Sequence, residues 1–336
     1  MWAIALSRCE PQTGDAPDEN SFTVYEMAER MVCFWPTSGY IRWRMFRGNT
    51  SKTLYFIKIG IPRAVKFGIF FLRNASQDAV DSALQRRDPL TPPRRLAFAV
   101  GDGFHAVGQE FLRYFVELAG LKPGDAVLDV GCGVGRMAVP LTGYLSSSGR
   151  YEGFDIVLPG IEWCTEHISS RFPNFRFRHS NVFNANYNRA GTVRASEYAF
   201  PYPDATFDFV FLTSVFTHML PEDLENYLAQ ISRVMKAGGR CLLTFFLLNS
   251  ESLRLIDENQ STQRFKYAIP HGRTSNLTNP EWSISYEETL VRSLLSKHSL
   301  TVTEPIHYGR WCSRQNYVSY QDLIIATKVG PESKVQ

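Results

Sequence analysis

Short apolar runs alternate with longer amphipathic segments over most of the chain. The short runs have the length and composition of buried strands, and the longer segments repeat their apolar residues at helical spacing. The pattern predicts seven strands, at residues 126–130, 151–157, 175–183, 207–215, 240–248, 300–308 and 320–329. It predicts helices between and beside them, at residues 111–121, 135–145, 160–172, 221–239 and 286–299.

This order of elements is typical of a parallel sheet with helices on both faces. The run "FDFVFLTSV" at residues 207–215 is apolar almost throughout, as a central strand buried on both faces should be. The helix after it has Pro221 at its first position and Gly238 at its end, and both residues favour helix boundaries there. We therefore predict an α/β fold with a doubly wound, seven-stranded, mostly parallel sheet.

Two segments depart from the alternation. The stretch "RRDPLTPPRRLAF" at residues 86–98 contains three prolines and four arginines, which is typical of a linker. Residues 250–285 break the rhythm of strands and helices and are expected to form a cap insertion. The sequence thus predicts an N-terminal extension over residues 1–95 and one α/β domain over residues 96–330.

The stretch "VLDVGCGVGRMAVPL" at residues 127–141 has glycines at alternate positions between a strand and a helix. A turn without side chains lets a ligand lie against the backbone and over the helix N-terminus. The dinucleotide pattern G-x-G-x-x-G would need a glycine at position 136, which is Arg136. The pattern present is D-x-G-x-G-x-G, formed by Asp129, Gly131, Gly133 and Gly135.

This spacing resembles motif I of the class I S-adenosylmethionine-dependent methyltransferases. Further landmarks of that family follow in the expected order over residues 100–328: Asp155 at the end of the second strand, "FPYPDATFDFVFLTSVFTHM" at 200–219 and "RVMKAGGRCLLTFF" at 233–246. The resemblance implies S-adenosyl-L-methionine as the cofactor and a binding site at the carboxyl edge of the sheet.

The resemblance also assigns parts of the cofactor site to residues. Gly131, Cys132 and Gly133 would line the methionine and ribose portion, with Asp129 behind them near the ammonium group. Asp155 would accept hydrogen bonds from both ribose hydroxyls, for which a carboxylate has two oxygens. Cys132 is expected to be small filler, because the sequence shows no partner that would activate its thiol.

The adenine end departs from the family pattern. Ile156 would pack on the base, and Asn181 stands where many members have an acid, so that Asn181 and Val182 would contact adenine. Thr213 and Ser214 could bond the carboxylate or ammonium of the methionine portion, or else only cap the strand end. Arg136 could meet the methionine carboxylate, or else form a surface salt bridge.

His218 is the candidate catalytic base. It follows the fourth strand at the edge where ligands bind in this fold, and its unperturbed pKa lies close to neutrality. An oxygen or nitrogen acceptor has to lose a proton during methyl transfer, which a histidine could take. The alternative is a histidine that only orients its loop.

The acceptor is predicted less closely. Segments that cover the active site could provide an aromatic, hydrogen-bonding wall suited to a sugar, a phenol or a lipid headgroup, from Phe104, His105, Phe246, Asn249, Trp282 and Trp311. Arg310 and Arg314 could attract an acidic acceptor. The function expected is methyl transfer to an oxygen or nitrogen atom of a small-molecule, sugar or lipid-linked acceptor. A non-catalytic protein that binds the cofactor, and a nicotinamide-dependent oxidoreductase, are the alternatives.

Charge is segregated in the N-terminal extension. Residues 30–77 contain nine Lys or Arg and no Asp or Glu, and the 29 residues before them contain six acids. In residues 40–73 the basic residues are interleaved with aromatic ones, which suits a membrane surface and, less readily, nucleic acid. The alternative is a loosely packed extension whose charges are simply solvated. The six scattered cysteines show no metal-ligand spacing and favour a reducing, cytoplasmic setting. The basic extension adds the prediction of peripheral contact with a membrane surface.

Overall fold

The structure is a computed structural model that describes residues 72, 74–81, 83–84, 86–96 and 103–330. Almost all of the basic segment 30–77, including the proposed membrane-contact segment 40–73, lies outside the described residues. Within the described part, no helix is both long and apolar enough to cross a bilayer.

The main sheet has seven strands in the order β10-β11-β5-β4-β1-β2-β3. Strands β1 to β5 run parallel, and β11 runs antiparallel to both of its neighbours. The prediction of a doubly wound, mostly parallel sheet is confirmed. The strands are β1 (Ala126–Val130), β2 (Arg150–Asp155), β3 (Phe175–His179), β4 (Phe207–Leu212), β5 (Met235–Phe245), β10 (Leu300–Val302) and β11 (Asp322–Lys328).

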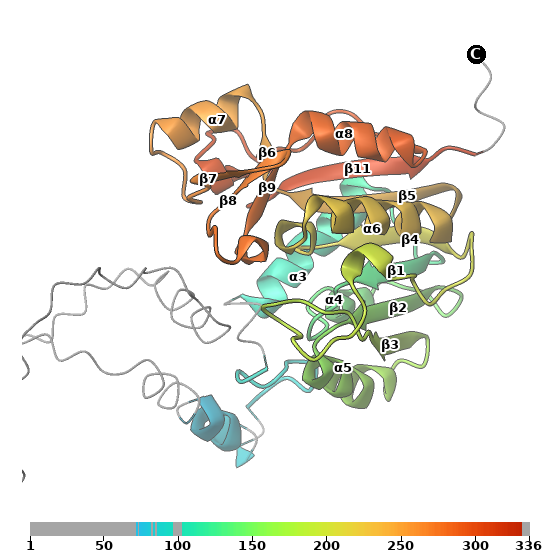
Figure 1. Cartoon of the computed structure of the whole chain (residues 1–336). Helices are drawn as coiled ribbons and strands as arrows, with labels where there is room; N and C mark the ends of the chain where they lie inside the picture. Colours follow the sequence, from blue (N-terminus) through green and yellow to red (C-terminus); the bar gives the residue numbers. More distant parts are fainter. Residues whose placement is uncertain (1–71, 73, 82, 85, 97–102, 331–336) are drawn as a thin grey trace, which may run out of the picture.

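Helices cover both faces of this sheet (Figure 1). In β4, Phe209 and Phe211 face a core shared with α3, α4 and α5, and Val210 and Leu212 face the opposite core under α6 and α8. The alternation explains why this strand is apolar throughout, since neither of its faces meets water. The helices are α3 (Phe104–Arg113), α4 (Ala138–Leu141), α5 (Leu158–Cys164), α6 (Pro221–Val234) and α8 (Glu288–Lys297).

The expected end of the helix after β4 was wrong. Helix α6 stops at Val234, and Gly238 lies inside β5 with a φ of +73°. The pairing of β4 with β5 shifts register between Phe207 and Phe209, so the glycine serves an irregularity of the strand. The helix expected at 135–145 is also shorter: α4 has only four residues, with turns before and after it.

Residues 247–287 form a second, four-stranded sheet in the order β6-β9-β8-β7, which we call the cap. It includes the predicted insertion 250–285 and begins directly after β5. A small apolar core lies beneath it, built from Phe246, Leu248, Leu255, Phe265, Trp311 and Cys312. The cap consists of β6 (Leu247–Leu248), α7 (Ser250–Asp257), β7 (Tyr267–Ile269), β8 (Gly272–Thr274), the 3-10 turn η6 (Pro280–Trp282) and β9 (Ile284–Glu287).

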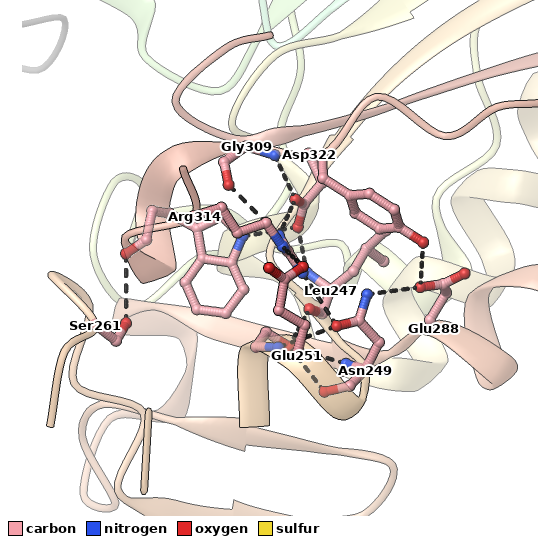
Figure 2. A network of polar contacts seen from close by, with 11 residues as sticks. Leu247, Asn249, Glu251, Ser261, Glu288, Gly309, Arg314 and Asp322 are labelled. Atoms are coloured by element: carbon pink, nitrogen blue, oxygen red, sulfur yellow. Dashed lines mark hydrogen bonds and ion pairs between the residues drawn. The ribbon is translucent and has the colours of Figure 1, made fainter. Parts of the chain in front are cut away.

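A buried ion pair joins the cap to the main sheet (Figure 2). Arg314, only 4% exposed, donates from Nη1 to Oδ1 of the fully buried Asp322 at 2.9 Å. The other Asp322 oxygen accepts from the backbone N–H of Leu247 and from the Trp311 indole, both at 2.7 Å. Burial raises the pKa of Asp322 to about 6, although Arg314 and the N–H donors act in the opposite direction.

The same guanidinium also reaches the cap. Arg314 donates from Nε to Glu251 at 2.9 Å and from Nη2 to the Asn249 side chain at 3.1 Å (Figure 2). One arginine therefore connects β11 with the segment that leaves β6 and enters α7. Removing such a cation leaves a buried carboxylate without compensation, which costs more than the pair itself contributes.

Replacing Arg314 with leucine is expected to lower the free energy of unfolding at pH 8 by about 3–5 kcal/mol, because Asp322 then stays buried without its cation. Urea unfolding followed by circular dichroism measures the loss. Arg310→Leu is the control, since Arg310 is exposed, and its change should stay within about 0.5 kcal/mol. Equal losses in the two variants would contradict this role of the ion pair.

Candidate active site

A cavity of about 1110 Å³ opens at the carboxyl ends of β1, β2 and β4. This edge, between β1 and β4, is where the strand order reverses, and doubly wound sheets bind their ligands at such a point. The cavity extends from the glycine turn after β1, past the end of β4, to the inner side of the cap. Its volume exceeds that of most single-ligand pockets, so it has room for two small molecules side by side.

The glycine turn has the open backbone that the sequence predicts. A Cβ on Gly131 would clash with the Val215 side chain, whereas a Cβ on Gly133 would meet no protein atom within 4 Å. Gly133 also has a φ of +54° and lines the cavity, so its bare backbone faces space that a ligand can fill. A Cβ on Gly135 would lie 2.8 Å from Ile168 Cδ1, which assigns that glycine to packing.

Asp155 fixes the shape of this turn from the end of β2. Its Oδ2 accepts from the Gly133 N–H at 2.7 Å, and its Oδ1 accepts from the Val157 N–H at 2.8 Å. Burial raises the pKa of Asp155, and the two N–H donors oppose the rise. Each carboxylate oxygen can accept a second hydrogen bond, so Asp155 keeps the capacity to bind a diol at the cavity wall.

Asp129 lies behind the turn and is only 1% exposed. Its Oδ2 accepts from the Tyr151 hydroxyl at 2.6 Å, while its Oδ1 has no hydrogen-bond partner among the described residues. Burial is the main reason that the pKa of Asp129 is raised to about 8. A buried oxygen without a donor, in a residue that lines the cavity, fits a ligand that brings a positively charged N–H group.

Of the other predicted cofactor residues, all but Asn181 line the cavity. These are Cys132, Arg136, Ile156, Val182, Thr213 and Ser214. Burial raises the pKa of the Cys132 thiol well above its usual value, which keeps the thiol protonated and agrees with the expected role as filler. Ser214 has a φ of +60° and donates from Oγ to Gln321 at 3.0 Å, so its backbone turns sharply where β4 ends.

Asn181 is a correction. It is exposed, does not line the cavity, and donates from its side-chain amide to the Thr192 hydroxyl at 2.7 Å. Strand β3 ends at His179, earlier than predicted, and adjacent residues in the extended chain beyond it point to opposite sides. Val182 therefore faces the cavity, and Asn181 faces away from it.

His218 reaches the same cavity from a 3-10 turn directly after β4. Its Nδ1 donates to the backbone carbonyl of Glu281 in the cap at 3.0 Å, and the Tyr187 ring lies edge-on to it at 5.5 Å. Burial lowers the pKa of His218, against the backbone carbonyls of Glu281 and Trp282, which favour its charged form. The ring is thus neutral at pH 7, and its free lone pair is on Nε2.

Only part of the expected acceptor wall faces the cavity. Phe246 and Trp282 line it, but Phe104, His105, Asn249 and Trp311 do not. The suggestion that Arg310 and Arg314 attract an acceptor was wrong, because neither lines the cavity. Arg314 forms the buried ion pair with Asp322, and Arg310 stacks on Tyr317. Residues that the sequence analysis missed include Asn184, Asn186, Tyr187, Gln263, Arg264 and Ser275.

Comparison with known proteins supports this description. Residues 128–243 match the family model described as a methyltransferase domain. A sterol 24-C-methyltransferase of Gibberella zeae is 30% identical over 145 residues, which is 42% of this chain and 33% of that protein. A phosphoethanolamine N-methyltransferase of Arabidopsis thaliana is 29% identical over 147 residues, 43% of this chain and 26% of that protein.

One more curated relative and one solved structure are also similar to this chain. A 27-O-demethylrifamycin SV methyltransferase of Amycolatopsis mediterranei is 31% identical over 134 residues, 39% of this chain and 43% of that protein. The chain thus spans less than half the length of these curated relatives. The crystal structure of a Burkholderia thailandensis 1,6-didemethyltoxoflavin-N1-methyltransferase has 18% sequence identity and a TM-score of 0.43, covering 82% of this chain and 94% of that one.

The reversal of strand order beside an open glycine turn defines a class of α/β proteins that bind a nucleoside-containing cofactor at the sheet edge. The family match narrows this class to a methyltransferase domain. Residues 128–243 therefore form a methyltransferase domain, and the class that the fold and this domain resemble is the class I S-adenosylmethionine-dependent methyltransferases.

Gly133→Ala and Gly238→Ala form a matched pair that tests the open turn. Both glycines have a positive φ, and neither Cβ would meet an atom within 4 Å, so both variants should lose about 1–2 kcal/mol of stability. Only Gly133 lines the cavity, so only Gly133→Ala should weaken binding of S-adenosylhomocysteine, by about tenfold or more in calorimetric titration. Equal affinities of the two variants would refute the placement of the cofactor.

Proposed function

We propose that the protein transfers a methyl group from S-adenosyl-L-methionine to an oxygen or nitrogen atom of a small-molecule, sugar or lipid-linked acceptor, with His218 as the general base. The observation that carries the proposal is that one cavity contains both the glycine turn and His218. A base beside a cofactor site has a chemical use only where a second reactant must lose a proton.

The residues present fit the cofactor. Asp129 would hold its ammonium group, Asp155 its ribose hydroxyls, and the Gly133 backbone would lie against it, with Ile156 and Val182 at the base. When bound, S-adenosylmethionine supplies a methyl group on a positively charged sulfur, ready for in-line displacement. The unpaired Asp129 Oδ1 supports this assignment most directly, since it is a buried acceptor that no described residue satisfies.

His218 would act on the acceptor. The hydrogen bond from Nδ1 to the Glu281 carbonyl fixes the ring and leaves Nε2 to take the acceptor proton. Its lowered pKa keeps it in the basic form at neutral pH. The rest of the acceleration would come from holding donor and acceptor at attack distance in a shared cavity, which needs no further catalytic group.

The relatives support a small acceptor and do not fix its kind. By name they act on sterols, on phosphoethanolamine and on a rifamycin, and they methylate carbon, nitrogen and oxygen atoms respectively. The choice of oxygen or nitrogen here comes from His218, because both atoms carry a proton that a base removes. Contact of residues 40–73 with a membrane surface, and a cytoplasmic setting, remain predictions from sequence.

His218→Ala is expected to bind S-adenosylhomocysteine with wild-type affinity. Its methyl-transfer turnover should be about 10²–10⁴-fold slower than that of the wild type, since a positioned base contributes that much. Turnover assays and calorimetry on the same preparations separate the two effects. His271→Ala, which removes an exposed cap histidine that does not line the cavity, should behave as the wild type.

The pH profile provides the second readout for His218. Because its pKa lies below the usual 6.5, kcat/KM for the acceptor, measured with S-adenosylmethionine at saturation, should stay level through pH 7 and fall only as the ring becomes protonated at lower pH. His218→Ala should lose this acid limb. Full activity in the variant, with the limb retained, would remove His218 from the mechanism and favour a non-catalytic or proximity-only role.

A further inference from the structure

Unsatisfied polar atoms gather at the end of the cavity that holds His218. Eight buried side-chain nitrogen or oxygen atoms in the described residues have no hydrogen-bond partner, and four of them belong to residues that line this cavity. One is Asp129, at the cofactor end. The other three are Nδ2 of Asn186, Oγ1 of Thr217, which directly precedes His218 in the chain, and Oγ of Ser275.

These three groups come from separate segments of the chain. Asn186 lies in the loop between β3 and β4, Thr217 in the 3-10 turn after β4, and Ser275 in the cap after β8. Asn186 and Thr217 are each only 1% exposed. Asn279 donates to the Asn186 carbonyl oxygen at 2.6 Å, so Asn186 Nδ2 is left as a donor. Buried donors and hydroxyls are normally satisfied, so these three groups need a partner that the described residues do not supply.

The chemistry of the three groups favours hydroxyls on the ligand. An amide N–H donates, and a Ser or Thr hydroxyl both donates and accepts, so together they match a molecule with several hydroxyl groups. An acceptor with a single polar atom, such as a sterol, would leave at least two of the three unsatisfied. Trp282 and Tyr187, which also line the cavity, can cover the apolar faces of a sugar ring.

Charge on the cap adds a second feature. The cap contains four Lys or Arg residues, and the two that do not line the cavity have carboxylate partners: Arg254 pairs with Glu258 at 2.7 Å and Arg273 with Asp257 at 3.5 Å. Arg264 and Lys266 line the cavity and have no ion pair with any described carboxylate. Unpaired cations facing a ligand site favour a negatively charged ligand.

We propose that the acceptor is a sugar that carries an anionic group, a phosphate or a carboxylate. Asn186, Thr217 and Ser275 bond its hydroxyls, and Arg264 and Lys266 hold the anion. The hydroxyl nearest His218 is methylated: its oxygen bonds to the methyl carbon as the carbon–sulfur bond breaks, its proton passes to Nε2, and S-adenosylhomocysteine leaves with the electron pair on sulfur. This assignment rests on the proposed methyl transfer.

An acceptor panel tests the assignment. S-adenosylhomocysteine release is measured with sugar phosphates, uronic acids, the matching neutral sugars, phenols, amines and sterols. Anionic sugars should have a kcat/KM about tenfold or more above that of the matching neutral sugar. The sugar phosphate and uronic acid arms show which anion is used.

The other outcomes of the panel are distinct. Equal use of neutral and anionic sugars, or turnover of phenols, amines or sterols alone, overturns the sugar assignment and leaves methyl transfer intact. Binding of S-adenosylhomocysteine without turnover of any acceptor overturns both proposals.

Paired variants test the residues. Thr217→Val should leave the unfolding midpoint unchanged or raised, because it removes an unsatisfied hydroxyl, and should raise KM for the anionic sugar about tenfold. Arg264→Gln combined with Lys266→Gln should raise KM for the anionic sugar and leave that for the neutral sugar unchanged. Lys122→Gln combined with Arg176→Gln removes the same charge from exposed positions outside the cavity and is the control. An unchanged KM in Thr217→Val, as expected if only water bonds the hydroxyl, contradicts the proposal.

Discussion

The structure depends on a carboxylate that is held out of water at the centre of the sheet. Asp129 is the penultimate residue of a fully buried strand, and only the Tyr151 hydroxyl satisfies one of its oxygens. Burial makes the ionised form unfavourable there even with Arg136 nearby, which is why the pKa of Asp129 is raised to about 8. Asp155 fixes the turn beside it by accepting a hydrogen bond from the Gly133 N–H, and the proposed ammonium group of the ligand would satisfy the second Asp129 oxygen.

The acceptor end is built from residues that are distant in sequence. The cap reaches the cavity because the buried pair of Asp322 and Arg314 fixes its base to β11 and because its core packs on Trp311. From that position the Glu281 carbonyl orients the His218 ring, and the cap brings Ser275, Arg264 and Lys266 to the same space. Fold stability and the placement of these cavity residues therefore depend on the same contact between the two sheets.

The sequence predicted the sheet, its central strand and the glycine turn, because periodicity and turn chemistry are local properties. It misplaced features that tertiary contacts decide. Gly238 appears to end a helix until the shifted pairing of β4 with β5 is seen, and Asn181 follows a strand that ends earlier than its alternation suggests. Arg314 was predicted to attract an acidic acceptor, because the sequence does not show that its buried partner is Asp322 in β11. The convergence of Asn186, Thr217 and Ser275 has no local signature.

Proton release on binding tests the role of Asp129 most directly. Calorimetric titration with S-adenosylhomocysteine at pH 7, in buffers of different ionisation enthalpy, measures it. Since the free carboxyl is mostly protonated below pH 8 and the ammonium favours the ionised form, binding should release about one proton, and affinity should rise as pH approaches 8. Asp129→Asn should abolish the release. Binding without proton release in the wild type, or the same release in the variant, would contradict the account.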